Sequence, residues 1–114
     1  MSPWALRSGA KGSLQVEIER AVNQTLVKLE GALDRSSARQ LAAGILRHLQ
    51  GNDARVRVVV AEGTHVERDH LQILGKMLAR QRHRISAAIP SAPATWAYLA
   101  NWLEVVPTDG ADLA

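Results

Sequence analysis

Three consecutive valines at positions 58–60 constrain the fold of this chain more than any other feature. Such a run is typical of a strand buried on both faces, and such strands occur in parallel sheets covered by helices. Apolar residues with helical spacing lie on both sides of the run. The sequence therefore predicts a buried strand over Arg55–Ala61, between two amphipathic helices.

The helix before this strand starts near Ser37. Its apolar residues follow the i, i+3, i+4, i+7 pattern of one helix face: Ala38, Leu41, Ala42, Ile45, Leu46 and Leu49. Ser37 and Gln40 have the spacing of a capping box, and Gly51 provides a stop after the last turn. The pattern predicts a helix that packs against the sheet through this stripe.

The helix after the strand is predicted over residues 70–82, with Leu71, Leu74 and Leu78 facing inward. Asp69 is the expected N-cap, and Gln72 at N3 would bond back to the cap amide. A third helix is expected after Pro93, with Trp96, Leu99 and Leu103 facing inward and with Trp102 or Tyr98 available for exposure.

Alternating or short apolar runs predict the remaining strands. These lie over residues 14–18, 25–30, 85–89 and 105–106, and the first two form an antiparallel pair joined around residues 20–24. The expected order is ββαβαβαβ. This order predicts an α/β sandwich with a mixed, mostly parallel sheet and about three amphipathic helices. One domain is expected over residues 13–108, with a flexible leader at 1–12 and a short tail at 109–114.

Composition limits the function classes. The chain has no cysteine and no long apolar run, so we expect a cytoplasmic protein without disulfides, thiolate metal sites or membrane insertion. A net charge of +3 does not by itself imply a nucleic-acid partner. The basic run Arg80–Arg84 favours the carboxyl end of a helix. Contact of this run with nucleic acid or anionic lipid remains the alternative.

Four ionisable residues, Glu67 to His70, stand where the second helix begins. His65 and His70 are five residues apart, which fits neither a helical i, i+4 pair nor a usual zinc spacing. The sequence contains neither the G-x-S-x-G nucleophile motif nor a glycine-rich phosphate loop. We therefore expect no metal, no cofactor and no enzymatic activity.

A short motif closes the second predicted strand: Leu29, Gly31, Leu33 and Asp34 match the pattern Leu-x-Gly-x-Leu-Asp. With this element order, the chain resembles the STAS domain, the family of anti-sigma-factor antagonists and sulfate-transporter regulatory domains. The resemblance covers about residues 14–108. It implies a non-catalytic regulatory protein that acts by binding another protein.

In the antagonist branch, the loop before the second helix typically reads Asp-Ser-Ser-Gly-Leu, and a kinase phosphorylates the first serine. With Leu71 set on that leucine, Arg68 occupies the phosphoacceptor position and His70 replaces the glycine. An arginine has no hydroxyl to phosphorylate, so this switch cannot operate here. Asp69 as a mimic of the phosphorylated state is an alternative to its capping role, although the adjacent Arg68 would weaken the mimicry.

The resemblance implies a partner-binding surface in this loop and the following helix. The predicted contact residues are Glu62, Thr64, His65, Glu67, Arg68, Asp69, His70 and Trp102. The expected partner is an anti-sigma kinase-like ATPase. Alternatively, the chain is a small STAS-like subunit of a bacterial lipid or anion transport assembly, bound to a transporter ATPase. Whether two copies form a homodimer is left open.

Overall fold

The computed structural model describes residues 14–21, 23–50, 55–91 and 94–107. Short 3₁₀ helices are labelled η. In chain order the elements are β1 (Leu14–Arg20), β2 (Gln24–Leu33), α1 (Arg35–Leu49), β3 (Arg55–Val60), β4 (His65–Val66), α2 (Arg68–Leu78), η1 (Ala79–Gln81), β5 (Ile85–Ile89), η2 (Ala94–Asn101) and β6 (Glu104–Pro107).

The strands form one mixed sheet. Its order is β1-β2-β3-β5-β6, and the two-residue β4 pairs with the end of β2. β1 and β2 are antiparallel, as the sequence predicts, whereas β2–β3, β2–β4, β3–β5 and β5–β6 are parallel. The expected α/β class with a mixed sheet is confirmed. β4 was not expected from the sequence.

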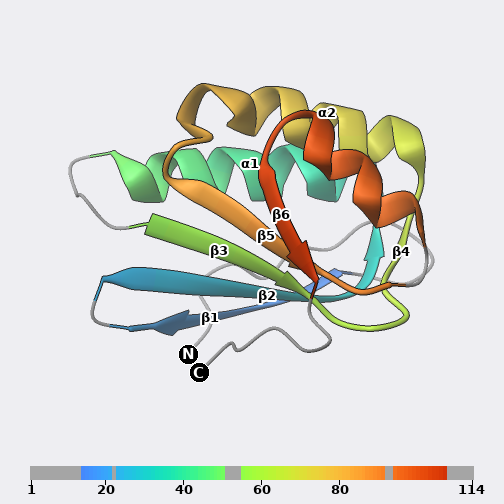
Figure 1. Cartoon of the computed structure of the whole chain (residues 1–114), viewed down its shortest axis with the longest axis horizontal. Helices are drawn as coiled ribbons and strands as arrows, with labels where there is room; N and C mark the ends of the chain where they lie inside the picture. Colours follow the sequence, from blue (N-terminus) through green and yellow to red (C-terminus); the bar gives the residue numbers. More distant parts are fainter. Residues whose placement is uncertain (1–13, 22, 51–54, 92–93, 108–114) are drawn as a thin grey trace.

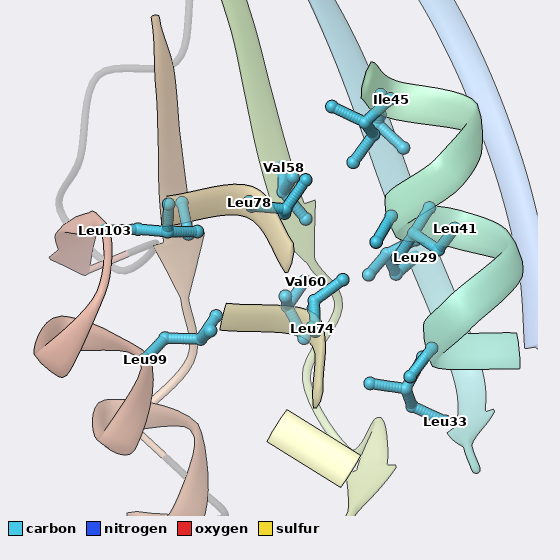
Figure 2. Packing of buried hydrophobic residues seen from close by; sticks show 14 of the residues in the cluster. Leu29, Leu33, Leu41, Ile45, Val58, Val60, Leu74, Leu78, Leu99 and Leu103 are labelled. Carbon is cyan, nitrogen blue, oxygen red and sulfur yellow. The ribbon is translucent and has the colours of Figure 1, made fainter. Parts of the chain in front are cut away.

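The helices cover one face of the sheet. Figure 1 shows α1 and α2 side by side above the strands, with η2 next to the start of α2. The core lies between these layers, where Leu41 and Leu74 meet Val58 and Val60 (Figure 2). Val59 points to the other face and is only half-buried, so the valine run is buried fully on one face alone.

The cap of α1 is one turn earlier than expected. Asp34, in extended conformation, is the N-cap, and its Oδ1 accepts a hydrogen bond from the Ser37 amide at 2.9 Å. Ser37 Oγ in turn accepts from the Asp34 amide at 2.9 Å, which completes a capping box. The prediction that Ser37 caps with Gln40 is wrong because Ser37 is the N3 residue. Gly51 lies outside the described residues.

The N-terminus of α2 also differs from the prediction. α2 begins at Arg68 after Glu67, whose side chain makes no cap hydrogen bond, so Asp69 is not the N-cap. Asp69 lies in the first turn, where its negative charge favours the helix dipole without bonding the orphan amides. α2 ends at Leu78, four residues earlier than predicted, and η1 continues the chain.

The third helix is η2, a 3₁₀ helix, and its apolar side chains lie as the sequence predicts. Trp96 and Leu99 are buried, and Leu103 after it is buried as well. Among the described residues, no helix has the length and apolar character needed to cross a membrane. The predicted leader (1–12) and tail (109–114) lie outside the part of the chain that the structure describes.

Candidate functional site

A tight turn leads out of β3 towards α2. The Thr64 amide donates to the Ala61 carbonyl at 3.2 Å, which closes a four-residue turn over residues 61–64. Gly63, the third residue of the turn, has a φ of +83°, and no described non-glycine residue has positive φ. This is the geometry of a type II turn, which requires glycine at that position. Glu62 is consequently presented to solvent on the outside of the turn.

Thr64, a predicted contact residue, lies inside the protein. Its side chain is 1% exposed, and Oγ1 donates to the Ala61 carbonyl at 2.7 Å. The backbone carbonyl of Thr64 accepts a hydrogen bond from Trp96 Nε1 at 2.8 Å. Trp96 is itself fully buried in η2. Because both groups are buried, these bonds fix the loop to η2 and leave Thr64 no side-chain atom for a partner.

β4 continues this fixed backbone. His65 and Val66 pair with the end of β2, opposite Ala32 and Leu33. Val66 points into the core, whereas His65 is exposed because successive side chains of a strand alternate in direction. The segment expected to be a polar loop is therefore partly a strand, and it presents His65 outward from a rigid frame.

The first turn of α2 carries the charged side chains. Glu67, Arg68 and Asp69 are all exposed. The Arg68 guanidinium lies over the ring of Tyr98 in η2, 4.8 Å from the ring centroid, which is within cation–π range. Tyr98 is 38% exposed. Arg68 and Tyr98 thus form one continuous exposed feature built from α2 and η2.

His70 has a different environment from its neighbours. It is half-buried, and its Nδ1 donates to the Leu33 carbonyl at 3.2 Å, so the bond ties the start of α2 to the end of β2. His70 also lines a hollow of about 630 Å³ with Asp34 and Arg39 at the start of α1. The residue is accessible at one edge, but part of its role is to hold the two segments together.

A wider groove separates the start of α2 from η2. Its volume is about 760 Å³, and its lining includes Arg68 and Tyr98 together with the small residues Ala94, Ala97 and Ala100. The three alanines lie on η2, three residues apart, which is the repeat of a 3₁₀ helix. Small side chains on this side of the groove leave room for side chains of another molecule.

Trp102 lies behind this surface. It is half-buried, and its ring packs edge to face with Tyr98, with ring centroids 5.7 Å apart. The ring also covers Gly75 in α2 so closely that a Cβ at this position would overlap it. Glycine at position 75 therefore permits α2 and Trp102 to approach, and Trp102 supports Tyr98 from below.

The Leu-x-Gly-x-Leu-Asp motif has a structural explanation in this fold. Leu29 and Leu33 are buried on the helix-covered face of β2. Gly31 has a φ of +122°, a conformation that residues with a side chain avoid. Asp34 caps α1. The motif thus ends β2 and begins α1 beside the loop that carries the charged residues.

The structure brings together all but one of the predicted contact residues at the carboxyl end of the sheet: Glu62, His65, Glu67, Arg68, Asp69 and His70 are accessible there, and Trp102 lies at its border. Sequence reasoning missed the specific role of Tyr98 and the anchoring of the loop by Trp96. Arg68 and Tyr98 are far apart in the sequence, and only the packing of η2 on α2 joins them.

Comparison with known proteins does not assign this chain to a family. No protein-family model matches the chain, and no curated protein matches it significantly. Within the described residues, no three histidine, aspartate or glutamate side chains are grouped so that they could hold a metal ion.

Proposed function

We propose that this protein is a non-catalytic, STAS-like regulatory protein that binds another protein at the carboxyl end of its sheet. We call the contact area the docking surface and define it as the exposed side chains of Glu62, His65, Glu67, Arg68, Asp69 and Tyr98. The pairing of Arg68 with Tyr98 on a rigid frame is the observation that carries this proposal. The resemblance in sequence motif and element order supports the STAS-like fold.

The composition of the docking surface favours protein recognition. Arginine and tyrosine are enriched among residues that dominate protein–protein binding energies. The Tyr98 ring holds the Arg68 guanidinium in place. The N–H groups of that guanidinium stay available to a carboxylate of the partner. The adjacent groove accepts partner side chains beside this pair.

The charges of the docking surface are available for pairing. Among the described residues, one salt bridge has an N···O distance within 4.0 Å. It joins Lys28 to Glu19 on the β1–β2 pair, away from this surface. Glu67, Arg68 and Asp69 therefore keep their charges unpaired within that part of the chain. A partner with the opposite pattern of charges would associate faster with this surface, and the charges would also fix its orientation.

The resemblance gives Arg68 the position of the family's phosphoacceptor. In our proposal, the docking surface is retained and the phosphorylation switch is lost, so binding is constitutive or is regulated on the partner. The proposed partner is an ATPase of the anti-sigma kinase type. An ATPase of a bacterial transport assembly is the alternative, and the same experiment separates the two.

The test is affinity capture from native cytosol and solubilised membranes, with the captured proteins identified by mass spectrometry. The variant Arg68→Glu/Tyr98→Ala removes the paired feature, and both side chains are exposed. His70 is left unchanged because its bond to Leu33 would be lost together with any partner contact. Arg47→Glu, an exposed charge reversal near the carboxyl end of α1, is the matched control.

We expect an ATPase to be captured by the wild type and by Arg47→Glu, and to be lost with Arg68→Glu/Tyr98→Ala, with all melting temperatures within a few degrees. A histidine-kinase-like ATPase supports the regulatory function, whereas a transporter ATPase supports the transport alternative. Equal capture by all three proteins contradicts the docking surface.

A further inference from the structure

β3 and β5 begin at the opposite end of the sheet (Figure 1). Arginine side chains gather at this end. Arg55, Arg57, Arg82 and Arg84 line a hollow of about 130 Å³, and Ser86 and Glu104 are also part of its lining. The sequence predicts that the basic run Arg80–Arg84 closes the second helix, but α2 ends at Leu78, and the run lies in η1 and the turn after it. The structure adds two arginines from a strand to this run.

Strand register brings these side chains together. Arg57 pairs with Ser86 in β5, and Ser86 pairs with Glu104 in β6. Val56 and Val58 face the helices, so the alternation of β3 turns Arg55 and Arg57 to the other face. The turn after η1 brings Arg82 to the same edge. Two chain segments, β3 and the turn after η1, thus supply one cluster of positive charge.

Arg57 is oriented for a ligand. Its Nε donates to Ser86 Oγ at 3.2 Å, which fixes the plane of the guanidinium. Within the described residues, the terminal amino groups of Arg57 make no hydrogen bond and no salt bridge. The Ser86 hydroxyl, having accepted from Arg57, still has a hydrogen to donate. Arg57 and Ser86 therefore offer adjacent donors to one acceptor group.

Neighbouring groups show that the region carries positive charge. Arg84 is held by a hydrogen bond from Nη1 to the Leu49 carbonyl at 3.3 Å. Burial lowers the pKa of the neighbouring His48 imidazole below its usual range, and the charges of Arg20 and Arg84 lower it further. Within the part of the chain that the structure describes, Glu104 is the one acidic residue in the lining of the hollow. The arginines outnumber it.

We infer that this hollow binds a phosphate group, either of inorganic phosphate or of a phosphomonoester. Guanidinium groups bind phosphate through paired N–H donors, which makes such charge-assisted bonds strong. The hollow is much smaller than the groove of about 760 Å³ at the docking surface, and it suits one tetrahedral oxyanion better than a whole nucleotide. The site is separate from the docking surface and does not depend on the proposed function.

Titration calorimetry of the full chain with inorganic phosphate at constant ionic strength tests the inference. Arg57→Gln should weaken binding about tenfold or more, since it removes a charge-assisted contact. Arg82→Gln, at an exposed position, should weaken phosphate binding severalfold. This variant replaces Arg57→Gln in the test if Arg57→Gln fails to fold. Arg39→Gln makes the same charge change in α1, close to the docking surface, and should have almost no effect.

Glu104 provides a test in the opposite direction. Glu104→Gln removes a negative charge from the lining of the hollow, so phosphate should bind about threefold more tightly. Weaker binding of this variant would overturn the site. The absence of saturable phosphate binding to the wild type, or equal losses in Arg57→Gln and Arg39→Gln, would overturn it as well.

A second arm identifies the source of the phosphate group. Phosphatidylcholine vesicles with and without phosphatidic acid present the group as a lipid headgroup. Binding to phosphatidic acid that falls with Arg57→Gln assigns a headgroup, whereas Arg57-dependent binding of inorganic phosphate alone assigns a soluble ligand. The inference is overturned if inorganic phosphate does not bind and if binding to vesicles or oligonucleotides is unchanged by Arg57→Gln. That result would indicate a diffuse basic surface instead.

Discussion

At the carboxyl end of the sheet, buried hydrogen bonds hold the backbone under a surface of mixed charge. At the amino end, by contrast, arginines from two segments line a small hollow. In parallel α/β sheets, ligands usually bind at the carboxyl end. Here that end has the stiffer frame and the wider groove. The two ends therefore suit different ligands: a protein surface at one and a compact anion at the other.

The comparison also concerns stability. Neutral bonds from Thr64 and Trp96 stabilise the docking end, and its charges stand outside the core. At the arginine end, like charges lie close together, and their repulsion lowers the stability of the fold. Substitutions at the first end should act through packing and hydrogen bonds, and changes at the second through charge, pH and salt.

The largest expected effect comes from Trp96→Phe. This change removes the indole N–H and leaves the buried Thr64 carbonyl without its partner, besides creating a small cavity. We expect the free energy of unfolding to fall by about 3 kcal/mol. Chemical denaturation measures it. If the loss is under about 1 kcal/mol, the loop is not anchored by this bond.

A smaller effect is expected for Gly63→Ala. A Cβ at position 63 would touch nothing within 4 Å, so the cost arises from the positive φ alone. We expect a loss of about 1 kcal/mol in the free energy of unfolding. Capture of the partner should weaken too, because the turn presents the docking surface. Unchanged stability would mean that the turn has another conformation. Gly44→Ala, a glycine-to-alanine change within α1, is the control for substitution at a glycine.

The smallest expected effect is a pH dependence of stability that comes from His48, near the arginine end. The folded protein holds the pKa of His48 below 6.5, its ordinary value. As the pH falls below about 6.5, the unfolded chain takes up a proton before the folded chain does, so the free energy of unfolding decreases. Above that pH both states are neutral at this position, and the contribution to stability is present in full.

Denaturation at a series of pH values from 7.5 to about 5 checks this prediction. His48→Gln should flatten the pH dependence, and His83→Gln, which removes an exposed histidine in the same region, should leave it in place. Added salt should reduce the part that comes from Arg20 and Arg84. If His48→Gln keeps the full slope, His48 is not its source.

Periodicity predicted most of the fold. The stripe of α1 and the alternation of β1 are local patterns, and both are present in the structure. The helix starts were predicted less well. Asp69 has the residue type of a cap, but α2 begins one residue before it, because His65 and Val66 first pair with β2. Which residue caps a helix depends on where the preceding segment is fixed. Here the pairing of β4 with β2, which are distant in sequence, fixes it.

The candidate site was predicted as a segment but not as a surface. The sequence predicts residues 62–70 as a charged loop, but the structure places residues 65–66 in β4 and begins α2 at Arg68. Thr64 also turns inward, and His70 bonds to the Leu33 carbonyl. Tyr98 and Arg68 are joined only through the packing of η2 on α2. The arginine hollow depends on strand register, which joins Arg57 to Ser86 across two strands. No local pattern contains that information.

The bond between Trp96 and the Thr64 carbonyl has a practical consequence. An indole whose N–H is bound inside a core emits at shorter wavelength than one that meets water. Any event that separates η2 from the loop after β3 exposes this indole and shifts its emission to the red. The chain has three tryptophans, so a Trp4→Phe/Trp102→Phe variant isolates the emission of Trp96, which then reports whether the loop after β3 stays bound to η2.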